Sequence, residues 1–321
     1  MQIHGAPHRC GVVLAAGEGR RLEPFVQRLC GHALPKQYVN FIGARSMLEH
    51  TFERAESFIA PQRIFTVVSK AHLSHTEVRR QLSRRPQGTV VIQPENKETA
   101  PGLLLPLMHI YKRYPDATVV VFPSDHFIVE EELFTAHVAL ACRVVERLPG
   151  YLILLGIEPD EPESEYGYIL PGEPVERLAP LAVRRIARFR EKPDRHTARE
   201  FLLGGGLWNT MVMIFKVETL LELVCEASPE LWRVFLRIHD AIGTAAEAEA
   251  VETAYKRIAP MNFSTGLLEA FACERAARLL VLPVHGVFWS DWGSERRIVA
   301  ALRKLGYLDR LNGWDDKSCA A

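Results

Sequence analysis

Short, continuously apolar runs recur along the chain, and they constrain its fold more than any other feature. Five of them are the segments "CGVVLAAG" from Cys10, "RIFTVVS" from Arg63, "GTVVIQP" from Gly88, "ATVVVFPSD" from Ala117 and "YLILLGI" from Tyr151. Their hydrophobicity is continuous rather than alternating, which indicates strands that are covered on both faces. The runs therefore predict a parallel sheet.

Segments of helical length separate these runs, such as "SMLEHTFERAESFI" and "EELFTAHVALACRVVERL". Successive β-α units predict an α/β, Rossmann-like, doubly wound sheet that binds its ligands at the carboxyl ends of the strands. After Gly156 the pattern changes to a hairpin, a strand at "WNTMVMIFK", helices over most of 219–277, and two final strands around "LLVLPVHGVFWSD". No internal repeat or low-complexity linker interrupts the chain, so we expect one elaborated domain.

Composition excludes several classes of function. Lysine plus arginine and aspartate plus glutamate both total 39, so the net charge of zero provides no field to recruit nucleic acid. No run approaches the roughly 18 to 20 apolar residues of a membrane span, and no signal peptide begins the chain. Six scattered cysteines form no C-x-x-C pair. We expect a cytoplasmic protein with small-molecule partners; a homo-oligomer remains open.

The glycine-containing loop "VLAAGEGRRLEPF" follows the first predicted strand. Gly17 and Gly19 allow backbone N–H groups to approach phosphate oxygens, because no Cβ obstructs them. A dinucleotide fingerprint would need a third glycine where Leu22 stands, and the P-loop pattern is absent, so a nicotinamide oxidoreductase is disfavoured. Two adjacent arginines follow instead, and "LPKQY" supplies Lys36 as another cation for the same phosphates.

Further motifs follow in a fixed order: "QPENKETAP" from Gln93, "FPSDH" from Phe122, "GIEPDEPESEYGYI" from Gly156, "FREKPD" from Phe189, "LWNTMVMIF" from Leu207 and "FWSDWG" from Phe288. With the glycine loop, they resemble the sugar-1-phosphate nucleotidyltransferases, especially the mannose-1-phosphate guanylyltransferase (GDP-mannose pyrophosphorylase) branch. The resemblance covers nearly all of residues 10–302. It implies a mixed sheet of the glycosyltransferase-A-like type, with a nucleotidyltransferase domain over 8–303 and a C-terminal extension over 304–321.

The reaction that the resemblance implies joins GTP and α-D-mannose 1-phosphate, with Mg²⁺, to give GDP-mannose and pyrophosphate. Because the chain is too short for an appended isomerase domain, we expect a single activity. The catalytic residues implied are Arg21, Lys36 and Lys192. The nucleotide-binding residues implied are Leu14, Ala15, Ala16, Gly17, Gly19, Arg20, Thr99, Ala100 and Ser124. The sugar-binding residues implied are Gly167, Glu191 and Asn209, and the metal ligands are Asp125 and Asp291.

Four departures from the family pattern leave alternatives open. Arg20 replaces a threonine, so either arginine could hold the pyrophosphate. The sequence Lys97-Glu98 replaces Arg-Asn before "TAP", "WNTMVM" replaces "WNSGMF", and 262–264 lack an aspartate expected near the sugar. The alternatives are the same chemistry with another sugar 1-phosphate, such as a heptose or glucose phosphate, or with another nucleoside triphosphate. A catalytically silent sensor of nucleotide-sugars is an alternative of another class.

Overall fold

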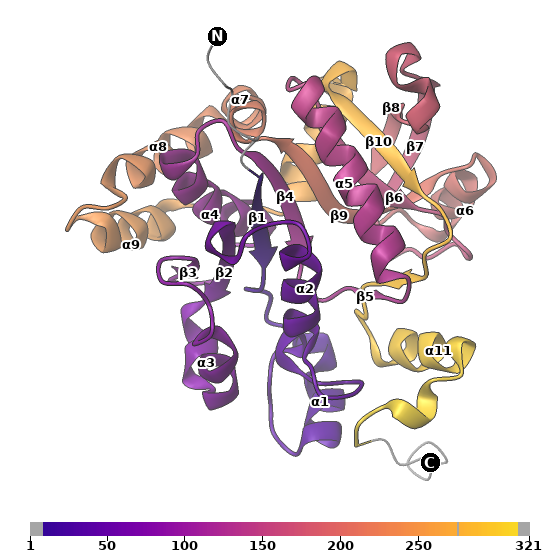
Figure 1. Ribbon diagram of the computed structural model, residues 1–321, viewed down its shortest axis with the longest axis horizontal. Helices are drawn as coiled ribbons and strands as arrows, with labels where there is room; N and C mark the ends of the chain where they lie inside the picture. The colour runs from indigo at the N-terminus through magenta and orange to yellow at the C-terminus, as the bar shows by residue number, and fades with distance from the viewer. Residues whose placement is uncertain (1–8, 275, 314–321) are drawn as a thin grey trace.

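A mixed sheet of nine strands forms the centre of the computed structural model, which describes residues 9–274 and 276–313 (Figure 1). The strand order is β3-β2-β1-β4-β9-β6-β10-β8-β7. A separate two-stranded sheet pairs β5 with β11. The strands are β1 (Arg9–Leu14), β2 (Ile64–Ser69), β3 (Val90–Gln93), β4 (Thr118–Pro123), β5 (Phe127–Ile128), β6 (Leu152–Ile157), β7 (Tyr168–Pro174), β8 (Arg184–Arg190), β9 (Leu207–Lys216), β10 (Leu279–Val284) and β11 (Trp289–Ser290).

Strand direction decides which residues share the functional edge of the sheet. Strands β1 to β4 are parallel, and β9 is inserted antiparallel between β4 and β6. Strands β6 and β10 therefore run in the same direction as β1 and β4. The ends of β1 and β4 lie side by side, with Leu14 paired to Pro123, and the start of β9 meets the end of β6, with Trp208 paired to Ile157. The predicted doubly wound mixed sheet is confirmed.

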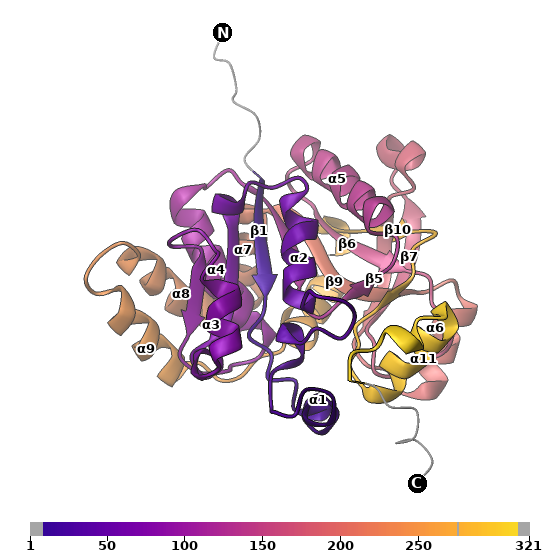
Figure 2. The same cartoon turned by 60° about the horizontal axis from the view of Figure 1, so that its bottom comes forward.

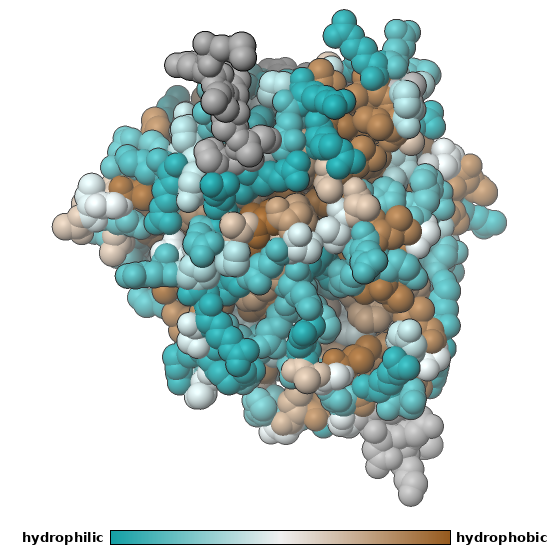
Figure 3. All heavy atoms as spheres, viewed as in Figure 1, coloured by the Kyte–Doolittle hydropathy of each residue, from teal (hydrophilic) through white to brown (hydrophobic). Residues whose placement is uncertain are grey.

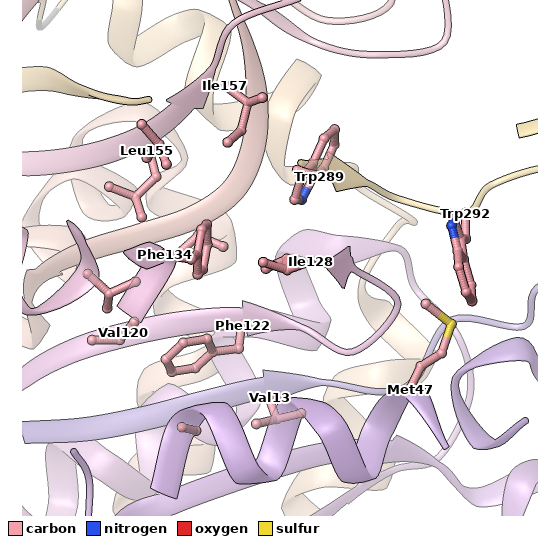
Figure 4. Close-up of a cluster of buried hydrophobic side chains, with 14 of the residues drawn as sticks. Val13, Met47, Val120, Phe122, Ile128, Phe134, Leu155, Ile157, Trp289 and Trp292 are labelled. Carbon is pink, nitrogen blue, oxygen red and sulfur yellow. The ribbon is translucent and has the colours of Figure 1, made fainter. Parts of the chain in front are cut away.

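Helices cover both faces of the sheet, which explains the continuous hydrophobicity of its strands. Val13 and Phe122 face the cluster beneath α2 (Met47–Glu56) and α5 (Glu131–Arg147), where Figure 4 shows them near Phe134. Their neighbours in sequence, Val12 and Val121, face α4 (Thr99–Arg113), α7 (Val217–Ala227) and α8 (Pro229–Ala241). The other α-helices described are α1 (Glu23–Cys30), α3 (Thr76–Leu82), α6 (Arg195–Leu203), α9 (Glu247–Arg257), α10 (Glu269–Glu274) and α11 (Glu295–Leu305).

The carboxyl edge of the sheet carries the segments that matter for function. Helices α1 and α11, which follow β1 and β11, lie at this end of the molecule in both ribbon views (Figures 1 and 2). Helix α11 continues to Leu305, across the predicted domain boundary at residue 303. Residue 8 of the predicted domain and residues 314–321 of the predicted extension lie outside the described residues.

The surface is predominantly polar on the face shown in Figure 3, where hydrophobic areas are small and interrupted. Within residues 9–274 and 276–313, no helix combines the length and apolar character that crossing a membrane requires.

The two final predicted strands form, but they belong to different sheets: β10 lies between β6 and β8, whereas β11 pairs with β5.

Candidate active site

The loop after β1 is shaped by a glycine and held by a glutamine. Gly19 has a φ of 64°, and a Cβ there would lie 3.3 Å from the backbone nitrogen of Lys36. The side-chain amide of Gln37 donates to the carbonyl oxygens of Ala15 and Gly17, both at 2.8 Å. Among the described residues, no oxygen accepts a hydrogen bond from the N–H of Gly17 or Gly19. Two backbone donors are therefore available to an anion.

This loop forms one wall of a cavity of about 420 Å³, which we call the loop pocket. The segments after β4 and β11 and the segment before α4 complete it, as the carboxyl-edge position of a doubly wound sheet predicts. Its lining residues are Leu14, Gly17, Glu18, Gly19, Arg20, Arg21, Leu22, Lys36, Gln37, Asn96, Glu98, Ser124, Asp125, Asp291 and Gly293.

Lys36 connects the two predicted metal ligands. Its ammonium lies 3.0 Å from Oδ2 of Asp125 and donates to the backbone oxygens of Asp291 at 2.9 Å and Trp292 at 3.2 Å. Burial of Asp125 is the largest single influence and opposes ionisation, but the charges of Lys36 and His126 and the hydrogen bonds to the carboxylate together outweigh it and hold the pKa of this carboxyl below its usual value. Asp125 is therefore a carboxylate at neutral pH.

The Asp291 carboxylate is fixed by several donors. Its Oδ1 accepts from the hydroxyl of Tyr166 at 3.1 Å and from the backbone N–H of Gly293 at 2.9 Å. The guanidinium of Arg297 contacts both carboxylate oxygens, at 3.3 and 3.4 Å. These contacts hold Asp291 in one orientation, while a quarter of its side chain stays exposed.

The donor set of the loop pocket fits Mg²⁺. The ion prefers oxygen ligands and is usually held by one or two carboxylates together with waters and substrate phosphates. Asp125 and Asp291 supply two carboxylates to the same pocket, and Asp125 has a third of its side chain exposed. Three or more metal-ligating side chains do not gather anywhere in the described part of the chain. A site that relies on substrate phosphates needs no such cluster.

The two adjacent arginines differ in what holds them. Nη1 of Arg21 donates to both carboxylate oxygens of Glu165, at 2.9 and 2.8 Å. Arg20 is more exposed and pairs with Glu18, two residues away, at 2.5 Å. Arg21 is thus anchored to a distant segment of the fold, whereas among the described residues Arg20 pairs only with its neighbour Glu18.

The three predicted sugar-binding residues lie together where β7, β8 and β9 meet. The backbone N–H of Asn209 donates to the carbonyl of Gly167 at 2.8 Å. A Cβ on Gly167 would lie 2.5 Å from Oε2 of Glu191, so a side chain at this position would displace the Glu191 carboxylate. Burial raises the pKa of Glu191, and Lys192 partly offsets that effect. Lys192 is exposed and has a φ of 44°; these four residues do not line the loop pocket.

Thr99, Ala100 and Ser124 have partners within the protein. Oγ1 of Thr99 accepts from the N–H of Phe263 at 2.7 Å, and the N–H of Ala100 donates to Met261 at 2.9 Å. Ser124 donates its hydroxyl to the carbonyl of Leu14 at 2.7 Å. These contacts join segments around the pocket, and the nucleotide contacts implied for the three residues stay predictions.

Four residues of the site were missed by sequence reasoning: Glu163, Glu165, Tyr166 and Arg297. The first three lie in the acidic segment before β7, where the sequence predicts a loop and hairpin and assigns these side chains no role. Arg297 lies on α11, where an arginine ordinarily faces solvent. Its nearly complete burial is a result of tertiary packing, and no local pattern signals it.

The chain matches known proteins in sequence and in fold. The nucleotidyl transferase family profile matches residues 10–306. The xanthan biosynthesis protein XanB of Xanthomonas campestris pv. campestris (strain B100) is 29% identical over 287 residues, and the mannose-1-phosphate guanylyltransferase 2 of Escherichia coli O157:H7 is 26% identical over 292. Each match covers 88% of this chain but only 57% and 58% of the relatives' own lengths.

A solved structure, described as a mannose-1-phosphate geranyltransferase from Thermus thermophilus, superimposes with a TM-score of 0.75. The superposition covers 92% of this chain and 79% of that one, at 25% identity. The family profile spans the glycine loop, Asp125 and Asp291, which the fold brings into one pocket. The chain therefore belongs to the nucleotidyl transferase family.

Proposed function

We propose that this chain transfers the nucleotidyl group of GTP to α-D-mannose 1-phosphate, with Mg²⁺, and releases GDP-mannose and pyrophosphate. One observation carries the proposal: the loop pocket combines free backbone donors, the three cations Arg20, Arg21 and Lys36, and the carboxylates of Asp125 and Asp291 in a single cavity. That combination suits a nucleoside triphosphate with a divalent ion.

The chemistry needs positive charge and alignment more than a protein nucleophile. The phosphate of a sugar 1-phosphate is itself the nucleophile, and the barrier comes from charge repulsion and from the need for in-line geometry. The N–H groups of Gly17 and Gly19 bind phosphate oxygens, and Arg21 stabilises the charge on the departing pyrophosphate. Lys36 keeps Asp125 ionised and in place.

Asp125 and Asp291 would hold Mg²⁺, which would neutralise charge on the phosphate oxygens when bound. Lys192 would meet the sugar phosphate as it enters. Glu191 and Asn209 would accept and donate hydrogen bonds to hexose hydroxyls, and the absence of a Cβ at Gly167 gives the ring access to them. The named activity of the Escherichia coli relative supports mannose 1-phosphate and GTP as the substrates to test first.

Pyrophosphate release tests the proposal. The purified chain is incubated with Mg²⁺ and each pairing of a nucleoside triphosphate with mannose, glucose or heptose 1-phosphate, and the product mass is measured. We expect release with GTP and mannose 1-phosphate. A different productive pair would correct the substrates, and binding of a nucleotide-sugar without turnover of any pair would identify a silent sensor instead.

The variant Asp125→Asn provides the control for the metal site, because it keeps the size of the side chain and removes its charge. We expect it to abolish release in the productive pair. Unchanged activity of this variant would contradict the role of Asp125 as a metal ligand.

A further inference from the structure

Arg297 is a nearly buried cation beside the loop pocket, with 9% of its side chain exposed. It lies in the first turn of α11, where Oγ of the N-cap Ser294 accepts its backbone N–H. Its guanidinium lies over the ring of Tyr166, with Cζ 4.8 Å from the ring centroid. Gly293 leaves room for the Arg297 guanidinium, because a Cβ on Gly293 would overlap it.

The guanidinium is surrounded by three carboxylates. Nη2 lies 3.0 Å from Oε2 of Glu165 and 3.4 Å from Oδ2 of Asp291, and Nη1 lies 3.8 Å from Oε2 of Glu163. Removing a guanidinium from water is costly unless carboxylates compensate it. A single side chain therefore joins the segment before β7 to the segment after β11.

Glu165 contacts both Arg297 and Arg21 and so connects the two arginines. Its Oε2 accepts from Arg297 at 3.0 Å and from Nη1 of Arg21 at 2.8 Å. Nε and Nη2 of Arg21 form no hydrogen bond with any described residue. These two nitrogens form an edge of the guanidinium that can bind two oxygens of one phosphate. Glu165 thus holds Arg21 by one nitrogen and leaves that edge free.

We propose that Arg297 is a positioning residue that sets the geometry of two groups of the loop pocket: Asp291 by direct contact and Arg21 through Glu165. The expected effect of Arg297 on turnover rests on the proposed function, whereas its expected effect on anion binding by Arg21 does not. Because Arg21 and Glu165 are both partly exposed, their ion pair adds little stability by itself. The ion pair instead fixes the orientation of Arg21. Orientation matters because displacing a reacting group by about 1 Å can cost roughly 100-fold in rate.

The variant Arg297→Gln tests the positioning role by separating binding from turnover. We expect a kcat lower by about tenfold or more and an almost unchanged KM for the sugar 1-phosphate. We expect partial recovery in Arg297→Lys, because an ammonium keeps the charge but cannot span Glu165 and Asp291 together. A purely structural role would instead lower the melting temperature and leave the kcat of the folded fraction intact.

Arg296→Gln is the matched control. Arg296 precedes Arg297 on the same helix, is 77% exposed, and contacts Glu163 at 3.2 Å. We expect its kinetics and its anion binding to equal those of the unchanged chain. An equal loss in both variants would overturn the proposal, because general weakening of α11 would then explain it.

Glu165→Gln keeps the proposal testable if Arg297→Gln fails to fold. Calorimetry with inorganic tripolyphosphate, with Mg²⁺ chelated, measures anion binding without turnover. We expect the Glu165→Gln dissociation constant to rise about three- to tenfold, because Arg21 loses its anchor. Equal or tighter binding would overturn the proposal, as would failure of the unchanged chain to bind tripolyphosphate. Binding without turnover of any substrate pair would instead refute only the proposed function.

The double variant completes the test. If Arg297 acts on Arg21 through Glu165, the effects of Arg297→Gln and Glu165→Gln on tripolyphosphate binding are expected to be non-additive. Additive effects would mean that the two residues act independently, which would contradict an action of Arg297 on Arg21 through Glu165.

Discussion

At the scale of single residues, Glu98 has an unusual backbone at the rim of the loop pocket. Its φ of 67° and ψ of −172° lie in a region that is essentially reserved for glycine. Its carboxylate forms no hydrogen bond or ion pair within the described part of the chain. The backbone N–H of Glu98 donates to Oδ1 of Asn96 at 2.9 Å, so the backbone is held in a strained position while the side chain has no partner among the described residues, as is common at ligand clamps.

Relief of this strain gives a prediction about stability. We expect Glu98→Gly to raise the free energy of unfolding by about 1–3 kcal/mol, measured by urea denaturation. Glu98→Ala is the control, because it removes the carboxylate but keeps the Cβ that makes this backbone costly. Equal stability of the two variants would contradict the strain argument.

Glu191 gives a prediction about pH. Burial raises the pKa of its carboxyl in the folded protein, so the folded state binds this proton more tightly than the unfolded state. The stability from this group is present below the unfolded pKa of about 4.3 and is lost as pH rises through the folded value. We expect Glu191→Gln to match the unchanged chain near pH 4 and to be more stable at pH 7.

Urea unfolding from pH 4 to 7 measures that difference. The exposed Glu173 provides the control, since Glu173→Gln is expected to change stability little at any pH. If the effect of Glu191→Gln were the same at every pH, titration of Glu191 would not be its cause. We also expect Glu191→Gln to raise the KM for the sugar 1-phosphate, because a proposed acceptor of hydroxyl hydrogen bonds is weakened.

Lys36 gives a prediction that combines stability and activity. Its ammonium is nearly buried, forms an ion pair with Asp125 and donates hydrogen bonds to two backbone oxygens. Lys36→Met leaves these acceptors without their donor, so we expect a loss of about 1–3 kcal/mol in unfolding free energy and abolished turnover. Lys70→Met is the control, because Lys70 is exposed and its one ion-pair partner in the described part of the chain is Glu252. Retained turnover in Lys36→Met would exclude Lys36 from the reaction.

At the scale of elements, the start of α2 shows how a helix is fixed in place. Ser46 accepts from the N–H of Glu49 at 3.1 Å, and the Glu49 carboxylate accepts from the N–H of Ser46 at 2.9 Å. The same serine hydroxyl donates to Gln81 of α3 at 2.7 Å. Reciprocal caps of this kind satisfy backbone donors that a helix start otherwise leaves unpaired.

Removal of this cap should destabilise the fold without altering the chemistry. We expect Ser46→Ala to lower the free energy of unfolding by about 1–2 kcal/mol, with an unchanged KM for either substrate. Ser228 begins α8 without a side-chain cap bond, so Ser228→Ala is the control and is expected to cost less. Similar losses in the two variants would contradict the capping explanation.

At the scale of the whole molecule, the antiparallel strand β9 determines how the two halves of the site meet. It pairs with β4 on one side and with β6 on the other, and its start also pairs with β7. Asn209 thereby comes beside Gly167. The segment after β11 reaches the loop pocket through the contact of Asp291 with Lys36. Distant parts of the chain are combined by sheet order rather than by proximity in sequence.

The sequence by itself determined the α/β class, the strands of the first half and the glycine loop. Continuous apolar runs must be covered on both faces, and glycines after a strand leave backbone donors free, so these features follow from local chemistry. The family motifs likewise pointed to Arg21, Lys36, Asp125 and Asp291, which the fold assembles in one pocket.

Only the tertiary structure decided where β9 inserts, that β11 pairs with β5, and that Arg297 is buried beside Asp291. The apolar pattern of a strand shows that both faces are covered but does not specify its neighbours or their direction. Glu165 and Arg297 are 132 positions apart, and each has the sequence context of an exposed residue. Their contact exists because sheet order and the packing of α11 bring them together, which no local pattern encodes.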